Sequence, residues 1–215
     1  MKNLFRHTLL SILACTSLVG VAQDPEIQLL DAVEAKNITQ VKQLLESSMN
    51  LDYEINGSPL LIAIKHQNIE LVELILKAGA NPDYYGHYYY SPLHMALILK
   101  NNEIVKALIN HNVDLEIRES GAIGKTAILF AAEYGDIELL KILLAGGANI
   151  DIADNYGDKA LAFAAFHGQL EMAKFLVSLS VDVNHQNRNS KTALIHAKDR
   201  GHAEIVGYLS GLNAK

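Results

Sequence analysis

The sequence predicts an all-α solenoid of about six helix-turn-helix repeats, joined by β-turn loops that we call fingers. Five positions at the start of apolar-periodic segments recur at steps of 33, 35, 33 and 33 residues, namely Pro59, Pro92, Ala127, Ala160 and Ala193. Four residues after each of them stands an alanine: Ala63, Ala96, Ala131, Ala164 and Ala197. A period of this length is typical of stacked helical units that bury their apolar faces against their neighbours.

The third repeat carries the most specific motif. Residues Ser91–Ala96 read Ser-Pro-Leu-His-Met-Ala, which resembles the Thr-Pro-Leu-His-x-Ala signature of ankyrin repeats. Residues Gly146–Asp151 likewise resemble the family's Gly-Ala-Asp-Val-Asn link. The resemblance covers nearly everything after residue 26. It implies an ankyrin-repeat solenoid, a scaffold on which binding sites are built.

The predicted ankyrin domain runs from residue 23 to residue 215 with no visible boundary inside it. Its first repeat is degenerate and has a polar outer face, as expected of a terminal cap. The first helix of the second repeat opens with Ser58-Pro59, a hydroxyl residue and a proline, which favours a capped helix start. The repeats are expected at approximately 26–52, 53–83, 84–116, 117–151, 152–184 and 185–215.

The N-terminus resembles a signal peptide spanning residues 1–22. Lys2 and Arg6 precede an apolar run, and Gly20–Ala22 resembles a cleavage site. The run is too short to span a bilayer, so no transmembrane span is expected in the mature chain. This pattern predicts export, to the periplasm in a bacterium. Ile12–Cys15 also resembles a lipobox, so a lipid anchor at Cys15 is one alternative. A second alternative is that this N-terminal segment forms a first helix of the repeat array.

Composition and motifs exclude several classes of function. The net charge of −6 argues against a nucleic-acid partner. Gly124-Lys125-Thr126 resembles the end of a P-loop, but Glu119 stands where that motif needs a glycine. The nine histidines show no metal-ligand spacing, and Cys15 is the only cysteine. We therefore predict no enzyme, no metal and no cofactor, with an active site of scattered residues as the alternative.

The candidate binding site is the concave surface of the solenoid, where finger tips and the ends of first helices contact partners in ankyrin proteins. Solvated positions there favour charged residues, yet many are aromatic or aliphatic here. Tyrosine gives a large, rigid contact area, so the pattern favours a protein partner. The alternative is that some of these side chains pack on one another. The predicted contact residues are Tyr53, His87, Tyr88, Tyr90, Ile98, Leu99, Ile123, Tyr134, Tyr156, Phe166, His167, Arg188 and Arg200.

The resemblance extends to small ankyrin-repeat proteins exported to the bacterial periplasm. It implies a protein-protein interaction scaffold with a stress-protective role or an immunity (inhibitor) role. The alternatives are an enzyme or small-molecule binder built in the same groove, and a host-directed secreted effector. A broad open concavity favours a protein partner, whereas a closed pocket with convergent polar groups favours a small ligand.

Overall fold

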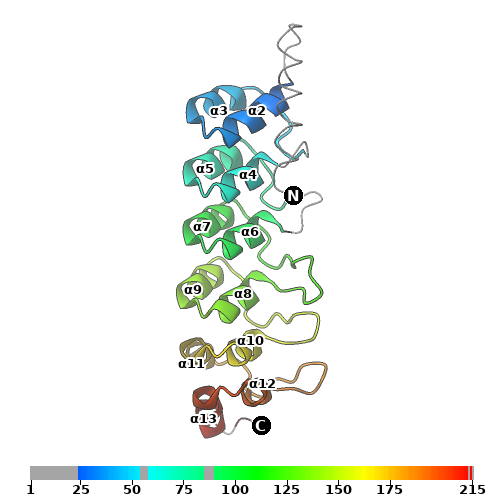
Figure 1. Cartoon of the computed structure of the whole chain (residues 1–215), viewed down its shortest axis with the longest axis vertical. Helices are drawn as coiled ribbons and strands as arrows, with labels where there is room; N and C mark the ends of the chain where they lie inside the picture. Colours follow the sequence, from blue (N-terminus) through cyan, green and yellow to red (C-terminus); the bar gives the residue numbers. More distant parts are fainter. Residues whose placement is uncertain (1–23, 54–57, 85–89, 213, 215) are drawn as a thin grey trace, which may run out of the picture.

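The structure, a computed structural model, describes residues 24–53, 58–84, 90–212 and 214, and in these residues it contains helices and no strands. The predicted all-α fold of about six helix pairs is confirmed. Figure 1 shows the pairs stacked in two columns from the N-terminus to the C-terminus. The pairs are α2 (Pro25–Glu34) with α3 (Ile38–Leu45), α4 (Pro59–Lys65) with α5 (Ile69–Lys77), α6 (Pro92–Ile98) with α7 (Asn102–Asn110), α8 (Ala127–Tyr134) with α9 (Ile137–Ala145), α10 (Ala160–Phe166) with α11 (Leu170–Ser178), and α12 (Ala193–Arg200) with α13 (Ala203–Gly211).

Each helix contacts its partner in the pair, and each first helix contacts the first helices of the neighbouring repeats. The first helices α8, α10 and α12 pack in series, and the second helices α9, α11 and α13 form the other column. The fingers leave the stack on the side of the first helices (Figure 1). The first helices therefore line the surface beside the fingers, where the candidate site was expected.

The recurring alanines lie at the centre of this packing. Ala63, Ala96, Ala131, Ala164 and Ala197 are all 0% exposed. Larger core residues such as Leu93 and Leu129 surround them. An alanine lets two helix backbones approach closely, and a larger side chain would overpack the contact. The alanine spacing thus fixes how closely successive repeats stack.

His94 joins the third repeat to the finger of the fourth. Ser91 caps α6 by accepting the backbone N–H of His94 at 3.3 Å, and its hydroxyl contacts His94 Nδ1 at 2.9 Å. On the far side of the ring, Nε2 donates to the carbonyl of Lys125 at 3.2 Å. Burial holds the pKa of His94 below its ordinary value, which favours the neutral ring that both contacts need.

The turn between the two helices of a repeat needs a left-handed residue. In the fifth repeat this is Gly168, with φ +75°. A Cβ atom there would lie 2.8 Å from the ring of His202 in the next repeat. The ring crosses this space to donate from Nε2 to the carbonyl of Phe166 at 3.0 Å. Glycine therefore allows the sixth repeat to hold the end of α10.

The described residues include no helix long and apolar enough to cross a bilayer. The expected signal peptide at residues 1–22 lies outside the described residues, as does Cys15. The structure begins instead with Asp24, whose carboxylate accepts the N–H of Glu26 and caps α2.

Replacing a central alanine should weaken the whole stack. We expect Ala131→Leu to lower the free energy of unfolding by about 1–3 kcal/mol, because the added carbons have no space between the helices. Ala145→Leu is the matched control, since this alanine is exposed at the end of α9 in the same repeat. Urea denaturation followed by circular dichroism measures both. Equal losses in the two variants would contradict the packing argument.

Candidate functional site

The finger of the fifth repeat is held by one buried carboxylate. Asp154 is 5% exposed, and its Oδ1 accepts the backbone N–H groups of Tyr156 and Asp158, both at 2.8 Å. These bonds fix the turn and leave the Tyr156 side chain 46% exposed. Burial is the main cause that raises the pKa of Asp154. The Asp154 carboxylate thus has a structural role: it shapes the loop that presents Tyr156.

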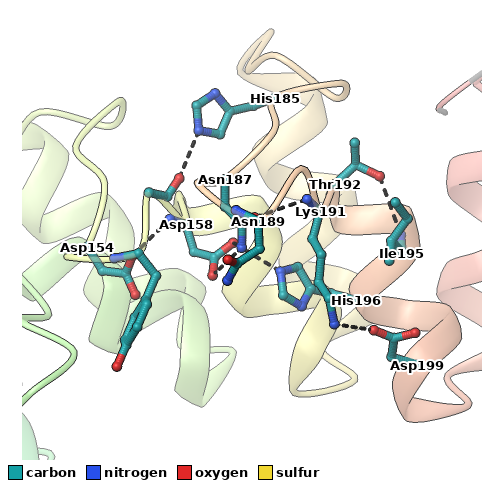
Figure 2. A network of polar contacts seen from close by, with 12 residues as sticks. Asp154, Asp158, His185, Asn187, Asn189, Lys191, Thr192, Ile195, His196 and Asp199 are labelled. Atoms are coloured by element: carbon teal, nitrogen blue, oxygen red, sulfur yellow. Dashed lines mark hydrogen bonds and ion pairs between the residues drawn. The ribbon is translucent and has the colours of Figure 1, made fainter.

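A second carboxylate ties this finger to the sixth repeat. Asp158 accepts from Asn187 Nδ2 at 2.9 and 3.0 Å, one bond to each oxygen, and from His196 Nε2 at 3.0 Å. Figure 2 shows Asp158 beside these two side chains, one from the next finger and one from α12. Three hydrogen bonds from two side chains to one carboxylate fix the position of the fifth finger relative to α12.

Backbone bonds hold the three C-terminal fingers in line. The N–H of Asn155 donates to the carbonyl of Ile123 at 2.9 Å, and the N–H of Arg188 donates to the carbonyl of Tyr156 at 2.9 Å. The predicted contact residues Ile123, Tyr156 and Arg188 therefore stand on successive, directly bonded fingers. Each of their side chains is exposed.

Between the fourth and fifth fingers and the first helices lies a cavity of about 420 Å³ that is open to solvent, which we call the finger groove. Its wall is mainly apolar. The structure brings four of the predicted contact residues together in it: Ile123, Tyr156, Phe166 and His167. The groove is lined by Ile123, Lys125, Glu133, Asp154, Tyr156, Asp158, Ala162, Phe163, Phe166, His167 and His196.

An ion pair forms part of the groove wall. Lys125 Nζ lies 2.7 Å from Glu133 Oε2, and the two side chains are largely buried. The same ammonium lies 4.2 Å from the ring centre of Phe130, in cation–π geometry. The Lys125 charge is therefore neutralised within the protein, and this lysine is unlike the phosphate-binding lysine of a P-loop.

Phe166 is the centre of an aromatic and cationic cluster at the end of α10. Its ring meets His167 edge-on at 5.0 Å and His196 at 5.8 Å. The guanidinium of Arg200 lies 4.3 Å above the ring centre. Burial is the largest cause lowering the pKa of His167, so this ring is held neutral more strongly than an exposed histidine. The predicted residues Phe166, His167 and Arg200 thus form one contiguous edge of the groove.

A second group of predicted residues lies on the third and fourth repeats, outside the groove lining. Tyr90 and Ile98 are exposed, whereas Leu99 is half-buried and packs against the core. The half-buried Tyr134 ring packs on Phe130 at 5.9 Å. Burial raises the pKa of the Tyr134 hydroxyl. Leu99 and Tyr134 therefore pack against neighbouring side chains, which is the alternative stated for some of the predicted contact residues.

Tyr53 departs from the prediction of an exposed finger residue. It is 7% exposed, and its hydroxyl donates to the backbone carbonyl of Glu26 at the start of α2. Burial raises its pKa far above the ordinary range. Tyr53 therefore belongs to the contact between the first two repeats. The predicted residues His87 and Tyr88 lie outside the described residues.

Several groove residues did not stand out in the sequence. Phe163 has the helical spacing of a core residue, and His196 stands one position away from the place of the signature histidine His94. A signal did exist for Asp154. Asn187 stands 33 residues later, and its Oδ1 accepts the N–H groups of Asn189 and Lys191 at 2.9 and 3.0 Å, as Asp154 does in its own finger.

The family follows from comparison with known sequences. A family model for ankyrin repeats in three copies matches residues 29–119 and 116–187, and a model for ankyrin repeats in many copies matches residues 167–209. The chain belongs to the ankyrin-repeat family. It is 32% identical over 115 residues to the human transient receptor potential cation channel subfamily A member 1. The aligned stretch covers 52% of this chain and 10% of the channel.

Another relative with a named activity is the phosphocholine transferase AnkX of Legionella pneumophila, 27% identical over 132 residues. That match covers 59% of this chain and 14% of the transferase. The chain spans only a minor part of both relatives, so the similarity concerns their ankyrin segments.

Small bacterial ankyrin domains match over nearly their whole length. An ankyrin repeat domain from Acinetobacter baumannii superimposes with a TM-score of 0.76 at 26% identity, covering 87% of this chain and 98% of that one. A chain in the complex of a predatory endopeptidase from Bdellovibrio bacteriovorus with an immunity protein gives a TM-score of 0.75 at 23% identity, covering 86% and 97%. At that identity the second match shows a shared fold.

The charge of Asp154 should be dispensable, since Asn187 does the same work in the next finger. Burial favours the protonated acid, so the carboxylate costs stability above its folded-state pKa and the cost vanishes as the pH falls below 3.8. We expect Asp154→Asn to be as stable as the wild type or more so at pH 7, with the advantage shrinking toward pH 4. Urea denaturation at both pH values measures this.

The control for this experiment is Asp182→Asn. Asp182 is exposed and accepts one backbone N–H, from Asn184 at 2.9 Å. This variant should show no comparable pH-dependent gain. A large loss of stability in Asp154→Asn at pH 7 would show that the negative charge itself holds the finger.

Proposed function

We propose that this protein is an exported scaffold that binds another protein through the finger groove and thereby restrains that partner, as an immunity or inhibitor protein in the bacterial periplasm. The observation that carries the proposal is the groove itself. A mainly apolar cavity open to solvent lies on the finger side of the stack, beside the exposed Tyr156 and Ile123. Exposed apolar surface next to a concave site is the usual mark of a protein interface.

The extent of the exposed apolar surface favours a protein over a small ligand. A small molecule is largely enclosed by its pocket. Here exposed side chains continue beyond the groove to Tyr90 and Ile98 on the third repeat. A partner segment lying along the fingers would cover both regions, whereas a small molecule in the groove would leave the second one in water.

The charged groups of the groove are engaged in structure. Lys125 pairs with Glu133, and Asp158 accepts from Asn187 and His196. Groups that already make such contacts within the protein are poor candidates for acid-base catalysis. Within the described ranges no cluster of three or more histidine, cysteine, aspartate or glutamate side chains is placed to hold a metal ion. These features support binding rather than catalysis.

An inhibitory role suits this fold. One of the structural neighbours is an immunity protein in complex with an endopeptidase. A rigid stack that presents a preformed groove can occupy a partner's functional surface without rearranging, which lowers the entropy cost of binding. We extend this role to the present chain as part of the proposal.

The groove is tested by removing its two aromatic anchors. We expect Tyr156→Ala together with Phe166→Ala to abolish capture of the partner from the native envelope fraction, because a central aromatic contact contributes about 2 kcal/mol or more. Ile69→Ala is the control, since Ile69 is an exposed apolar residue on the second-helix column. Mass spectrometry identifies the captured protein, and circular dichroism verifies the folding of each variant.

The same experiment decides the inhibitory role. Adding the wild-type chain should lower the activity of the captured partner, and the double variant should not. Capture that is equal in wild type and double variant would place the interface elsewhere. The absence of any captured protein would favour a small-molecule ligand for the groove.

Export is tested by the state of the N-terminus. We expect the mature chain in the periplasmic fraction to begin at Gln23, because Gly20–Ala22 resembles a cleavage site. Intact-mass measurement separates this form from one that begins with a lipid-modified Cys15, which would fractionate with membranes. An unprocessed chain confined to the cytoplasm would contradict export.

A further inference from the structure

One cation at the edge of the finger groove forms no ion pair within the described residues. The exposed Arg200 ends α12, and its guanidinium lies 4.3 Å above the ring of Phe166 in the groove wall. A planar guanidinium stacked on an aromatic face keeps its edge donors free for another group. The stacking therefore holds a charged donor at the mouth of the groove.

The carboxylates near this cation are engaged elsewhere. Within the described part of the chain, no acidic side chain forms an ion pair with Arg200. Each nearby acid already has its own donor: Glu133 has Lys125 at 2.7 Å, Asp158 has His196 at 3.0 Å, and Asp199 has Lys191 at 2.6 Å. The neighbouring acids Glu133, Asp158 and Asp199 thus have partners of their own, and within the described residues none of them pairs with Arg200.

A second arginine lies on the finger next to the groove. Arg188 is exposed on the sixth finger, and its backbone N–H donates to the carbonyl of Tyr156. No ion pair is found for its side chain in the described ranges either. Two arginines therefore belong to this region, Arg200 on the ring of Phe166 and Arg188 on the finger bonded to Tyr156, although the chain as a whole carries a net charge of −6.

We infer that the finger groove takes an acidic peptide segment of the partner, in which a bulky apolar side chain enters the groove and a neighbouring carboxylate pairs with Arg200. This inference rests on the proposed function and names the chemistry of its partner. The apolar wall accounts for the anchor, and charge complementarity accounts for the acid. A guanidinium binds a carboxylate through two parallel hydrogen bonds, which adds orientation to the contact.

The test begins with a displayed library of random peptides, selected on the purified full chain. We expect the enriched sequences to share an aromatic or large aliphatic residue next to Asp or Glu. The best peptide is then measured by fluorescence anisotropy together with its analogue in which the acid is replaced by the amide. Binding should also weaken as salt rises, because the contact is ionic.

Two protein variants assign the acid to its arginine. Arg200→Ala should lower the affinity for the acidic peptide by about tenfold or more, as expected for the loss of a hydrogen bond to a charged group. The amide analogue should lose a similar factor on the wild type and nothing further on Arg200→Ala, which is the signature of a direct pair. Lys198→Ala, on the same helix and also exposed, removes an equal charge and should bind the acidic peptide normally.

Several outcomes would overturn the inference. They are enriched peptides that lack acids or carry basic residues, an amide analogue that binds as well as the acid, or equal losses in Arg200→Ala and Lys198→Ala. The comparison of the acidic peptide with its amide analogue needs no protein variant. It therefore tests the need for a carboxylate even if Arg200→Ala fails to fold. Selected peptides that carry no acid but bind the wild type and not Phe166→Ala would contradict this inference and still support the proposed scaffold. No enrichment at all, or binding unaffected by Phe166→Ala, would count against both.

Discussion

The close stacking of the first helices is the constraint on which the rest of the molecule depends. Ala131, Ala164 and Ala197 are fully buried where α8, α10 and α12 pack in series. Because the helices are set at this spacing, the fingers above them come within hydrogen-bonding distance, and Asn155 and Arg188 bond to the preceding fingers. The groove depends on this alignment of helices and fingers, since residues of two fingers and three first helices form its wall.

Polar residues in this half of the chain position the backbone, and apolar residues face the opening. Asp154 is buried so that its finger has one shape, and Asp158 links that finger to Asn187 and His196. Both acids line the groove, yet Oδ1 of Asp154 and both oxygens of Asp158 already accept protein donors. The exposed Tyr156 is what these bonds leave available for contact. A site built in this way is preorganised for binding and has few groups left for catalysis.

The sequence predicted the fold well because the period, the alanines and the helix caps are local features repeated along the chain. It also predicted four residues of the groove, among them Tyr156 and Phe166. It missed Phe163 and His196, and it placed Tyr53 on the surface. Which way a side chain points depends on the repeat stacked against it, and the pattern within one repeat does not contain that information. Tyr53 is buried because the start of the first repeat offers it a carbonyl acceptor.

The groove lies in the half of the stack whose turns between paired helices contain glycine. In the first three repeats, the left-handed residue between the helices is Lys36, Gln67 or Lys100, and a non-glycine residue there costs about 1–2 kcal/mol. The last three repeats have glycine at this turn, and Gln169 and His202 use the space to bind the preceding helix ends. One of these bonds holds the carbonyl of Phe166, and the other that of Glu133. Both residues line the groove, so the half of the stack with unstrained, cross-bonded turns is also the half that positions the binding surface.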